Sequence, residues 1–310
     1  MATQLRLLSK LFRFELLASG LAVAAVFALT IVIHAHITSV LPTQACISGW
    51  NGSENDAVAI GCHNMTEYFS RVEHEAGQLT GAFILLPPLI GIVLGTILVA
   101  REIEQRTAQF AWSLGSNRLR WLGERILPVT AYFLVLLVLL AIAADLLESA
   151  RVPYIDTRAA FIDYGQRGLP LIARGLAGFA AAILIGSIVG RQLPALILAT
   201  LVPVGLMYAG GALFPYGIPF ETVVQNTAPS GVGSSFYTDY IANEVFVDAN
   251  GKTSDMPPPG TTAEDVKTAF IEIPGRRLGE VEAREGAVLL GVAVAGFAGT
   301  AVVVRRRRPY

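Results

Sequence analysis

The sequence predicts an all-α integral membrane protein with six transmembrane helices. Hydrophobic residues make up 53% of the 310 residues and charged residues only 15%, against about 25% charged in a typical soluble domain. The mean hydropathy of +0.55 points the same way. Six apolar runs of about eighteen residues or more are long enough to cross a bilayer core of about 30 Å. They must cross as helices, because lipid offers no hydrogen-bond partners to an open sheet edge.

The six predicted spans are almost free of charge. They cover residues 16–33, 80–100, 126–144, 169–190, 193–214 and 286–304. Pro87, Pro88 and Pro203 remove backbone donors and should kink the second and fifth spans. Gly91 and Gly95 stand four residues apart, a spacing that lets helices pack closely inside a bundle or at a dimer seam. We predict that residues 1–310 form a single transmembrane domain.

Basic residues predict the orientation of the spans, because Lys and Arg in short flanks stay on the cytoplasmic side. An even number of spans puts both termini on one side. The segments on that side hold thirteen of the 23 Lys and Arg residues and four of the 24 acidic ones. The opposite segments hold nine basic and twenty acidic residues. We therefore predict that both termini and residues 101–125 are cytoplasmic, and that residues 34–79 and 215–285 form outer loops.

The first span is expected to be retained, because no A-x-A-like cleavage site leads into a plausible soluble chain and more spans follow. The residues before it alternate apolar and basic side chains at helical spacing: Leu5, Arg6, Leu8, Lys10 and Leu11. A helix lying along the membrane interface and a simple continuation of the first span fit this pattern equally well.

The first outer loop holds both cysteines of the chain, Cys46 and Cys62. In an oxidising compartment such a pair is expected to form a disulfide that closes a short loop. His63 and His74 share the loop, but nothing in their spacing fixes the ligand geometry that a metal requires. We predict a disulfide and no metal site.

The second outer loop is predicted to be a small extracytoplasmic cap. Thr262, Glu264 and Asp265 are typical of a helix start, with a capping hydroxyl and acids in the first turn. Gly251-Lys-Thr imitates the end of a phosphate-binding loop, but Phe246 stands where that motif needs a glycine. We therefore expect no nucleotide site, and no cofactor, in this chain.

No catalytic constellation is predicted, because the motifs H-E-x-x-H and G-x-S-x-G are both missing from the sequence. Arg174 is the basic residue within a span, near its outer end. An ionisable residue at that depth is costly unless it faces the bundle and finds a partner, which Asp145 or Glu148 could supply. Two interpretations stay open: Arg174 snorkels to the interface, or it lines a translocation path.

Residues 101–125, REIEQRTAQFAWSLGSNRLRWLGER, are unusually polar for a segment between two apolar spans. A helical wheel separates Ile103, Phe110, Leu114 and Trp121 from the charges, and residues 115–117 form a natural break between two short helices. A solvated loop without a task rarely contains so many aromatic residues. We predict an amphipathic segment that docks on the membrane or on a partner.

At these residues the sequence resembles the bacterial permease subunits of type-2 (ABC-2) ATP-binding-cassette transporters. That family leaves its second span with Arg-Glu-x-Glu-x-Gly-Thr, followed by a Leu-Ala-Trp-like run, a polar turn with Ser and Arg, and a Trp. The matching stretches here are residues 101–107, 110–113 and 117–122. Arg106 departs from the pattern, since the family commonly has Gly there. Six spans with a long last outer loop agree with the resemblance over the whole chain.

The resemblance implies a transport mechanism. In this family the segment after the second span contains a cytoplasmic coupling helix, which docks on a separate ATPase subunit and transmits its closure to the spans. The resemblance thus implies that the following residues couple the chain to the ATPase, the tryptophans as anchors and the charged side chains as contacts or orienting groups: Glu102, Glu104, Trp112, Arg118, Arg120 and Trp121.

The resemblance also implies the partners and the location. ATP and Mg would bind to the partner ATPase, and a second permease copy, identical or related, would complete the pair. The chain would lie in the bacterial plasma membrane, contact lipid and no nucleic acid, and export a hydrophobic or amphipathic compound without being an enzyme itself. The alternative is a membrane scaffold, immunity or assembly factor that binds a partner without transport.

Overall fold

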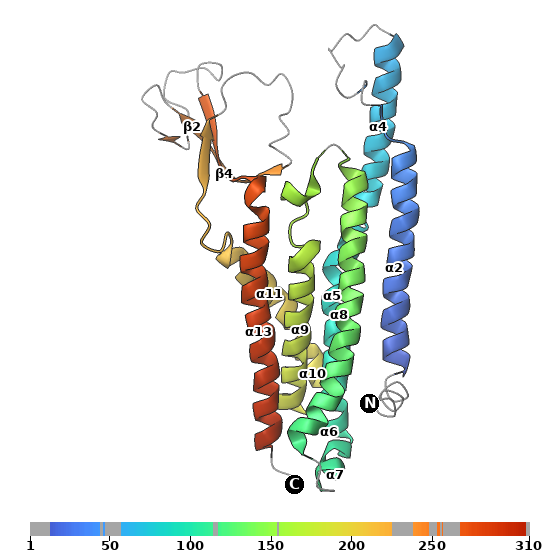
Figure 1. Cartoon of the computed structure of the whole chain (residues 1–310), viewed down its shortest axis with the longest axis vertical. Helices are drawn as coiled ribbons and strands as arrows, with labels where there is room; N and C mark the ends of the chain where they lie inside the picture. Colours follow the sequence, from blue (N-terminus) through green and yellow to red (C-terminus); the bar gives the residue numbers. More distant parts are fainter. Residues whose placement is uncertain are drawn as a thin grey trace. The chain divides into compact units, whose positions relative to one another are not determined.

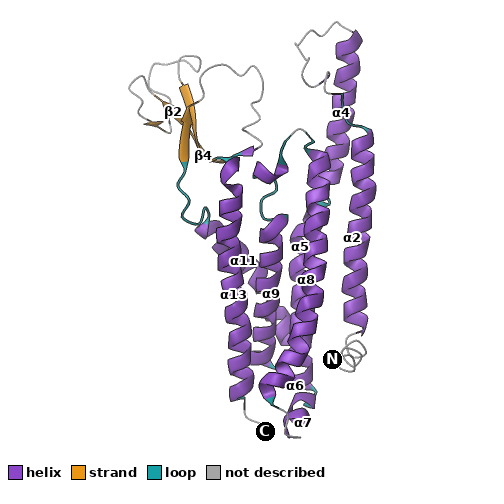
Figure 2. Ribbon diagram, viewed as in Figure 1, coloured by secondary structure: helices purple, strands orange, loops and turns teal. Residues whose placement is uncertain are grey.

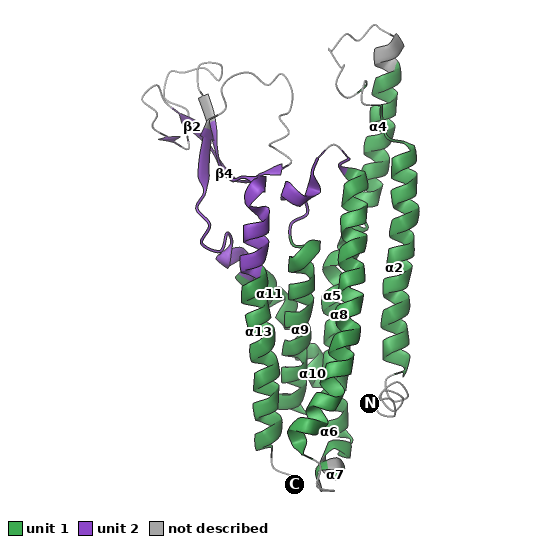
Figure 3. Cartoon of the chain, in the orientation of Figure 1, with its two compact units in different colours: residues 1–151, 165–209, 286–310 green, residues 152–164, 210–285 purple. Residues whose placement is uncertain are grey.

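The computed structural model describes residues 13–43, 46, 57–113, 117–153, 155–224, 238–247, 253–254, 256 and 267–307. The chain divides into two compact units (Figure 3). The first unit comprises Met1–Arg151, Gly165–Ala209 and Gly286–Tyr310, and the second comprises Val152–Tyr164 and Gly210–Glu285. The predicted N-terminal lead-in, the glycine and lysine of the Gly251-Lys-Thr motif, and the predicted helix start at residues 262–265 lie outside the described residues.

Within the described residues, six helical segments are long and apolar enough to cross a membrane, which confirms the predicted fold class (Figures 1 and 2). They contain α2 (Arg13–Ser39), α5 (Thr80–Thr96) within the longer helical stretch Gly61–Glu104, α8 (Arg118–Arg151), α9 (Gly168–Val189), the pair α10 (Gln192–Ala199) and α11 (Leu201–Leu213), and α13 (Leu278–Arg306). The fifth span is interrupted at Thr200, because Pro203 cannot donate a hydrogen bond and its ring crowds the carbonyl four residues before it. Pro87 and Pro88 lie inside α5.

Helices α5 and α9 pack closely at the centre of the first unit, and small residues make this possible. A Cβ atom added to Gly95 would lie 2.8 Å from the carbonyl oxygen of Phe179 and 2.9 Å from the Cβ of Ala182. Phe133 of α8 and Phe179 of α9 also pack together, with tilted rings whose centroids are 5.1 Å apart. The predicted close approach at Gly95 therefore lies inside the bundle.

The predicted first outer loop contains a helix that hydropathy did not reveal, α4 (Ala57–Gly77). The predicted disulfide between Cys46 and Cys62 is present and joins α4 to the chain beyond α2. Arg151 of α8 donates to Glu73 of α4 (2.7 Å) and to Glu148 (3.0 Å), whose side chain is 3% exposed. A buried carboxylate is tolerated only when it is paired, so this cluster fixes the C-terminal turns of α4 against α8.

The second unit contains a four-stranded antiparallel sheet in the order β1-β4-β2-β3 (Figure 2). The strands are β1 (Glu221–Val224), β2 (Tyr240–Val247), β3 (Thr253–Ser254) and β4 (Lys267–Ile273). The helix start predicted at residues 262–265 lies outside the described residues, and residues 267–273 form a strand. The β-branched residues Thr268, Ile271 and Ile273 with Phe270 favour a strand there, and β1 and β2 pair with it on both sides.

A buried carboxylate, Glu272, lies in β4 and is 5% exposed. Its pKa is raised above the ordinary value of 4.5, chiefly because burial disfavours the charged form, and further by Asp239 and Glu221; Arg276 acts in the opposite direction. Glu221 stands directly opposite Glu272 in the sheet and bonds instead to Arg276. The sheet therefore carries a carboxylate that is more easily accommodated when protonated.

We expect Glu272→Gln to stabilise the sheet at neutral pH, because the amide imitates the protonated form. A carboxyl group whose pKa is higher in the folded state than in the unfolded state lowers the free energy of unfolding as the pH rises from the unfolded-state pKa through the folded-state pKa. The stabilities of wild type and variant should therefore converge as the pH is lowered toward 4.5. Amide hydrogen exchange of β2 and β4 in detergent is the measurement, with severalfold slower exchange expected at pH 7 in the variant. Glu244→Gln is the control, since it removes an exposed carboxylate of β2 in the same sheet and should not slow exchange. Equal exchange in Glu272→Gln and wild type at pH 7 would contradict this account.

Candidate functional site

The segment that joins the second and third spans lies at the end of the first unit where α2 begins and α13 ends, here called the termini end (Figure 1). Helix α5 continues through a π-helical turn, Ile97–Arg101, into the short α6 (Glu102–Glu104). The chain turns at Gln105 and Arg106 and forms α7 (Thr107–Ser113) before α8 starts. The helical part of the segment is divided at Gln105 and Arg106, and the predicted break at residues 115–117 lies mostly outside the described part.

Three charged residues at the start of this segment each contact a different helix. Arg101 pairs with Glu15 of α2 at 3.2 Å. Glu102 accepts a 2.7 Å hydrogen bond from Nε of Arg125 in α8. Glu104 accepts a 2.8 Å hydrogen bond from the backbone N–H of Gln192, the first residue of α10, where a negative charge also suits the helix dipole. We call Arg101, Glu102 and Glu104 the charge hub.

The Glu102–Arg125 pair is the most buried contact of the charge hub. The Glu102 side chain is 7% exposed and that of Arg125 is 23% exposed. The guanidinium of Arg125 also lies over the ring of Trp121, 4.6 Å from its centroid. Removing one partner of such a pair leaves an uncompensated buried charge, which typically costs about 3–5 kcal/mol. The pair therefore fixes α6 to the first turns of α8.

Trp112 and Trp121 lie in the protein interior, 9% and 4% exposed. Their rings meet edge to face with centroids 5.4 Å apart, and Arg118 lies 5.0 Å from the Trp112 centroid. Each indole N–H is buried without a hydrogen-bond partner among the described residues. The two rings contact each other and hold α7 against α8, so they anchor these two helices of the chain to one another.

Gln105, Arg106 and Phe110 are exposed residues of the segment, here called the exposed turn. Phe110 is 68% exposed, whereas Ile103 is 6% exposed. The helical wheel that put Ile103, Phe110 and Trp121 on one face is wrong for Phe110. The reason is the turn at Arg106, which interrupts the helix and gives α7 a different rotation from α6.

Arg106 has a φ of 61°, in the left-handed region. Its own N–H bonds to the carbonyl of Ile103 at 3.1 Å, and its carbonyl accepts the N–H of Phe110 at 3.1 Å. An L-residue with a Cβ is disfavoured there by roughly 1–2 kcal/mol, whereas glycine is not. This is the position at which the resembled family commonly has glycine, so the tight bend is retained although the glycine is not.

The remaining predicted site residues lie apart from the charge hub. Arg118 donates to the carbonyl oxygens of Arg305 (3.2 Å), in the last turn of α13, and of Arg307, immediately after it. Arg120 is exposed and pairs with Glu124 at 2.9 Å. Arg174 donates to the carbonyl of Gly165 at 3.3 Å, three residues before α9 begins. That contact directs the Arg174 side chain toward the start of its own helix.

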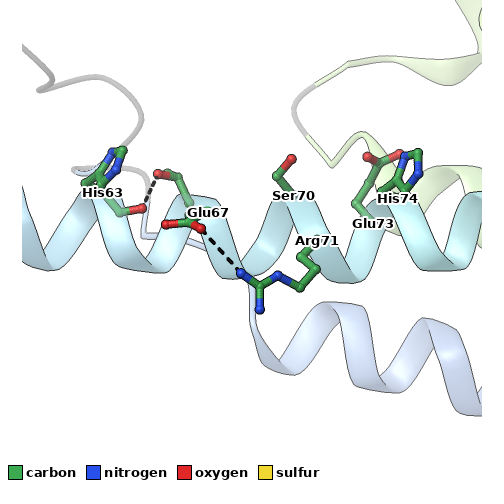
Figure 4. A pocket seen from close by; sticks show the side chains of 7 residues that line it. His63, Glu67, Ser70, Arg71, Glu73 and His74 are labelled. Carbon is green, nitrogen blue, oxygen red and sulfur yellow. Dashed lines mark hydrogen bonds and ion pairs between the residues drawn. The ribbon is translucent and has the colours of Figure 1, made fainter.

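A shallow polar pocket runs along α4 and is unrelated to the charge hub (Figure 4). His63, Glu67, Ser70, Glu73 and His74 line it, together with Thr66 and Arg71. Glu67 pairs with Arg71 at 3.3 Å. Within the described residues no group of three or more potential ligands could hold a metal ion, so the pocket has no feature of a metal centre.

Sequence reasoning missed the partners of the charge hub. It selected Glu102 and Glu104 but not Glu15, Arg125 or the N–H of Gln192, which lie 86, 23 and 88 residues away along the chain from the side chains they meet. Nothing in one sequence links positions so far apart.

A family model described as ABC-2 membrane transporter related matches residues 20–214. The matched region runs from α2 to the fifth span and includes the charge hub, the exposed turn and both buried tryptophans. No curated protein and no solved structure matches the chain.

We expect Arg106→Gly to raise the free energy of unfolding by about 1 kcal/mol, because glycine adopts a positive φ without a Cβ clash. Arg106→Ala is the matched control: it removes the same charge but keeps the Cβ, so it should give no gain. Thermal unfolding of the purified protein in one detergent would compare the two. A glycine variant no more stable than the alanine variant would contradict the strain assigned to this turn.

Proposed function

Because the chain belongs to the ABC-2 membrane transporter related family, we propose that it is the membrane-spanning permease subunit of an ABC transporter. In this proposal it exports a hydrophobic or amphipathic compound, and a separate cytoplasmic ATPase supplies the energy by hydrolysing ATP with Mg. Two permease subunits, identical or related, form the membrane part. The termini end is then the cytoplasmic face of a bacterial plasma membrane protein.

The observation that carries this proposal is the charge hub. Its three residues are consecutive or nearly so, yet they contact α2, α8 and α10. A force applied to this short segment acts on the ends of three spans at once. A partner can shift a two-state equilibrium only through contacts that differ between the states, and the charge hub offers such contacts at the place where a soluble partner can reach.

The exposed turn supplies the surface for that partner. Phe110 exposes an aromatic ring on the short helix α7, and the exposed Gln105 and Arg106 precede that helix. Aromatic residues and arginine are enriched where proteins bind one another. The buried tryptophans behind the turn hold α7 against α8. A displacement of Phe110 by a partner therefore moves α8 as well.

The proposed substrate class follows from the spans. Their residues are apolar, and the charges in the described first unit gather near the helix ends. Such an interior suits an apolar or amphipathic compound. The outward direction comes from the resemblance of residues 101–122 to exporter-type permeases.

Co-purification from mild detergent tests the proposal, with Phe110→Asp as the decisive variant. Wild type should retain a soluble nucleotide-binding ATPase in stoichiometric amount, and Phe110→Asp should lose it at least tenfold. A charge placed at the centre of an apolar contact removes a hot-spot residue worth about 2 kcal/mol or more.

Tyr68→Asp is the matched control, because Tyr68 is an aromatic residue of α4 that is 49% exposed and should keep the ATPase bound. Thermal unfolding of both variants shows whether the bundle is intact. If folded wild-type protein purifies without any ATPase under conditions that preserve complexes, the transporter proposal is contradicted and a scaffold, immunity or assembly factor is favoured.

A further inference from the structure

The end of α13 contacts two other helices at the termini end. Arg118, the first residue of α8, donates to the carbonyl oxygens of Arg305 and Arg307. Arg307, immediately after α13, donates through Nη1 to the carbonyl of Ser187 in the last turn of α9, at 2.5 Å. Two guanidinium groups thus connect the ends of three helices that are far apart in sequence.

Both contacts satisfy groups that a helix leaves open. The last four carbonyls of a helix have no partner within it and form the negative end of its dipole. Arg118 meets that end of α13, and Arg307 meets that end of α9. A cation at a helix C-terminus stabilises that end modestly, so each contact holds a helix end and still lets it move.

The chain makes room for Arg307 at one glycine. Gly190 follows α9 with a φ of 65°, and a Cβ there would lie 2.3 Å from Nη2 of Arg307 and 3.0 Å from Cγ2 of Ile103. Ile103 stands between Glu102 and Glu104 of the charge hub. The Arg307 side chain, the end of α9 and α6 therefore meet at Gly190.

These contacts form a continuous path from the exposed turn. Arg118 lies over the ring of Trp112 in α7, holds the end of α13, and through Arg307 reaches the end of α9. We propose that Arg118 and Arg307 are positioning residues that pass a displacement of α7 to α13 and α9, two helices that the charge hub does not hold through its charges. The inference deepens the proposed function: the charge hub moves α2, α8 and α10, and the two arginines move α13 and α9.

A partner-free measurement tests whether the path exists, by amide hydrogen exchange of the purified chain in lipid nanodiscs. Arg118→Ala should speed exchange in the last turn of α9 about tenfold, although Arg118 itself contacts α13. Arg307→Ala should have the same effect on α9, and Arg307→Lys should restore part of the protection. Unchanged exchange at the end of α9 in Arg118→Ala would overturn the path.

Arg306→Ala is the matched control. Arg306 is the neighbouring arginine, is exposed, and makes neither of these two contacts. It should leave exchange in α9 unchanged. Equal effects of Arg306→Ala and Arg307→Ala would show that only net charge matters and would also overturn the inference.

The second measurement tests the role in transport and uses the complex with its ATPase. Spin labels at Ile188→Cys and Val302→Cys, both at exposed positions of α9 and α13, report the distance between these helices with and without a non-hydrolysable ATP analogue. The analogue should change the distance in wild type and Arg306→Ala, and by less than half as much in Arg307→Ala with the ATPase still bound. An equal change in Arg307→Ala would refute the role in transport.

The two measurements separate two kinds of failure. If no ATPase co-purifies, the proposed function fails while the exchange result still decides whether the path exists.

Discussion

Charges that enter a membrane-spanning bundle must be neutralised by partners, because a charged side chain away from water is costly until it is paired. The termini end depends on this constraint most strongly at Glu102, which is buried. Arg101, Glu102 and Glu104 are each paired with a group on another helix, namely Glu15, Arg125 and the N–H of Gln192 respectively. Pairing therefore sets the positions of three helix ends, and the tryptophans fill the space behind the pairs.

The cost of placing polar groups in lipid also explains which features the sequence could predict. Lipid requires long apolar helices, so hydropathy located all six spans, and the close approach at Gly95 followed from glycine spacing. The polar segment between two spans was identifiable because its charged and aromatic residues interrupt two apolar runs. The disulfide followed from two cysteines in one loop. These features are local, and each leaves its signal within about twenty consecutive residues.

The features that escaped prediction depend on distant partners or on weak local signals. Helix α4 is amphipathic and carries several charges, so a search for apolar runs passed over it. Strand β4 follows a stretch that imitates a helix start, and only its pairing with β1 and β2 makes it a strand. Phe110 is exposed, contrary to the helical wheel, because one turn with a positive φ rotates α7 away from the face that α6 presents. The partners of Glu102 and Arg118 could come only from the three-dimensional arrangement.

Arg106 has a consequence for how this protein would change under selection. A turn that holds an arginine where glycine fits better gives up stability, and sites of that kind commonly serve function instead. A screen for thermostable variants should therefore select substitutions at Arg106 early, since relief of strain is an easy gain. Those same variants would lose a cation from the exposed turn. Thermostability would then be a poor guide to activity in this protein, and engineered versions intended for structural work should leave this arginine in place.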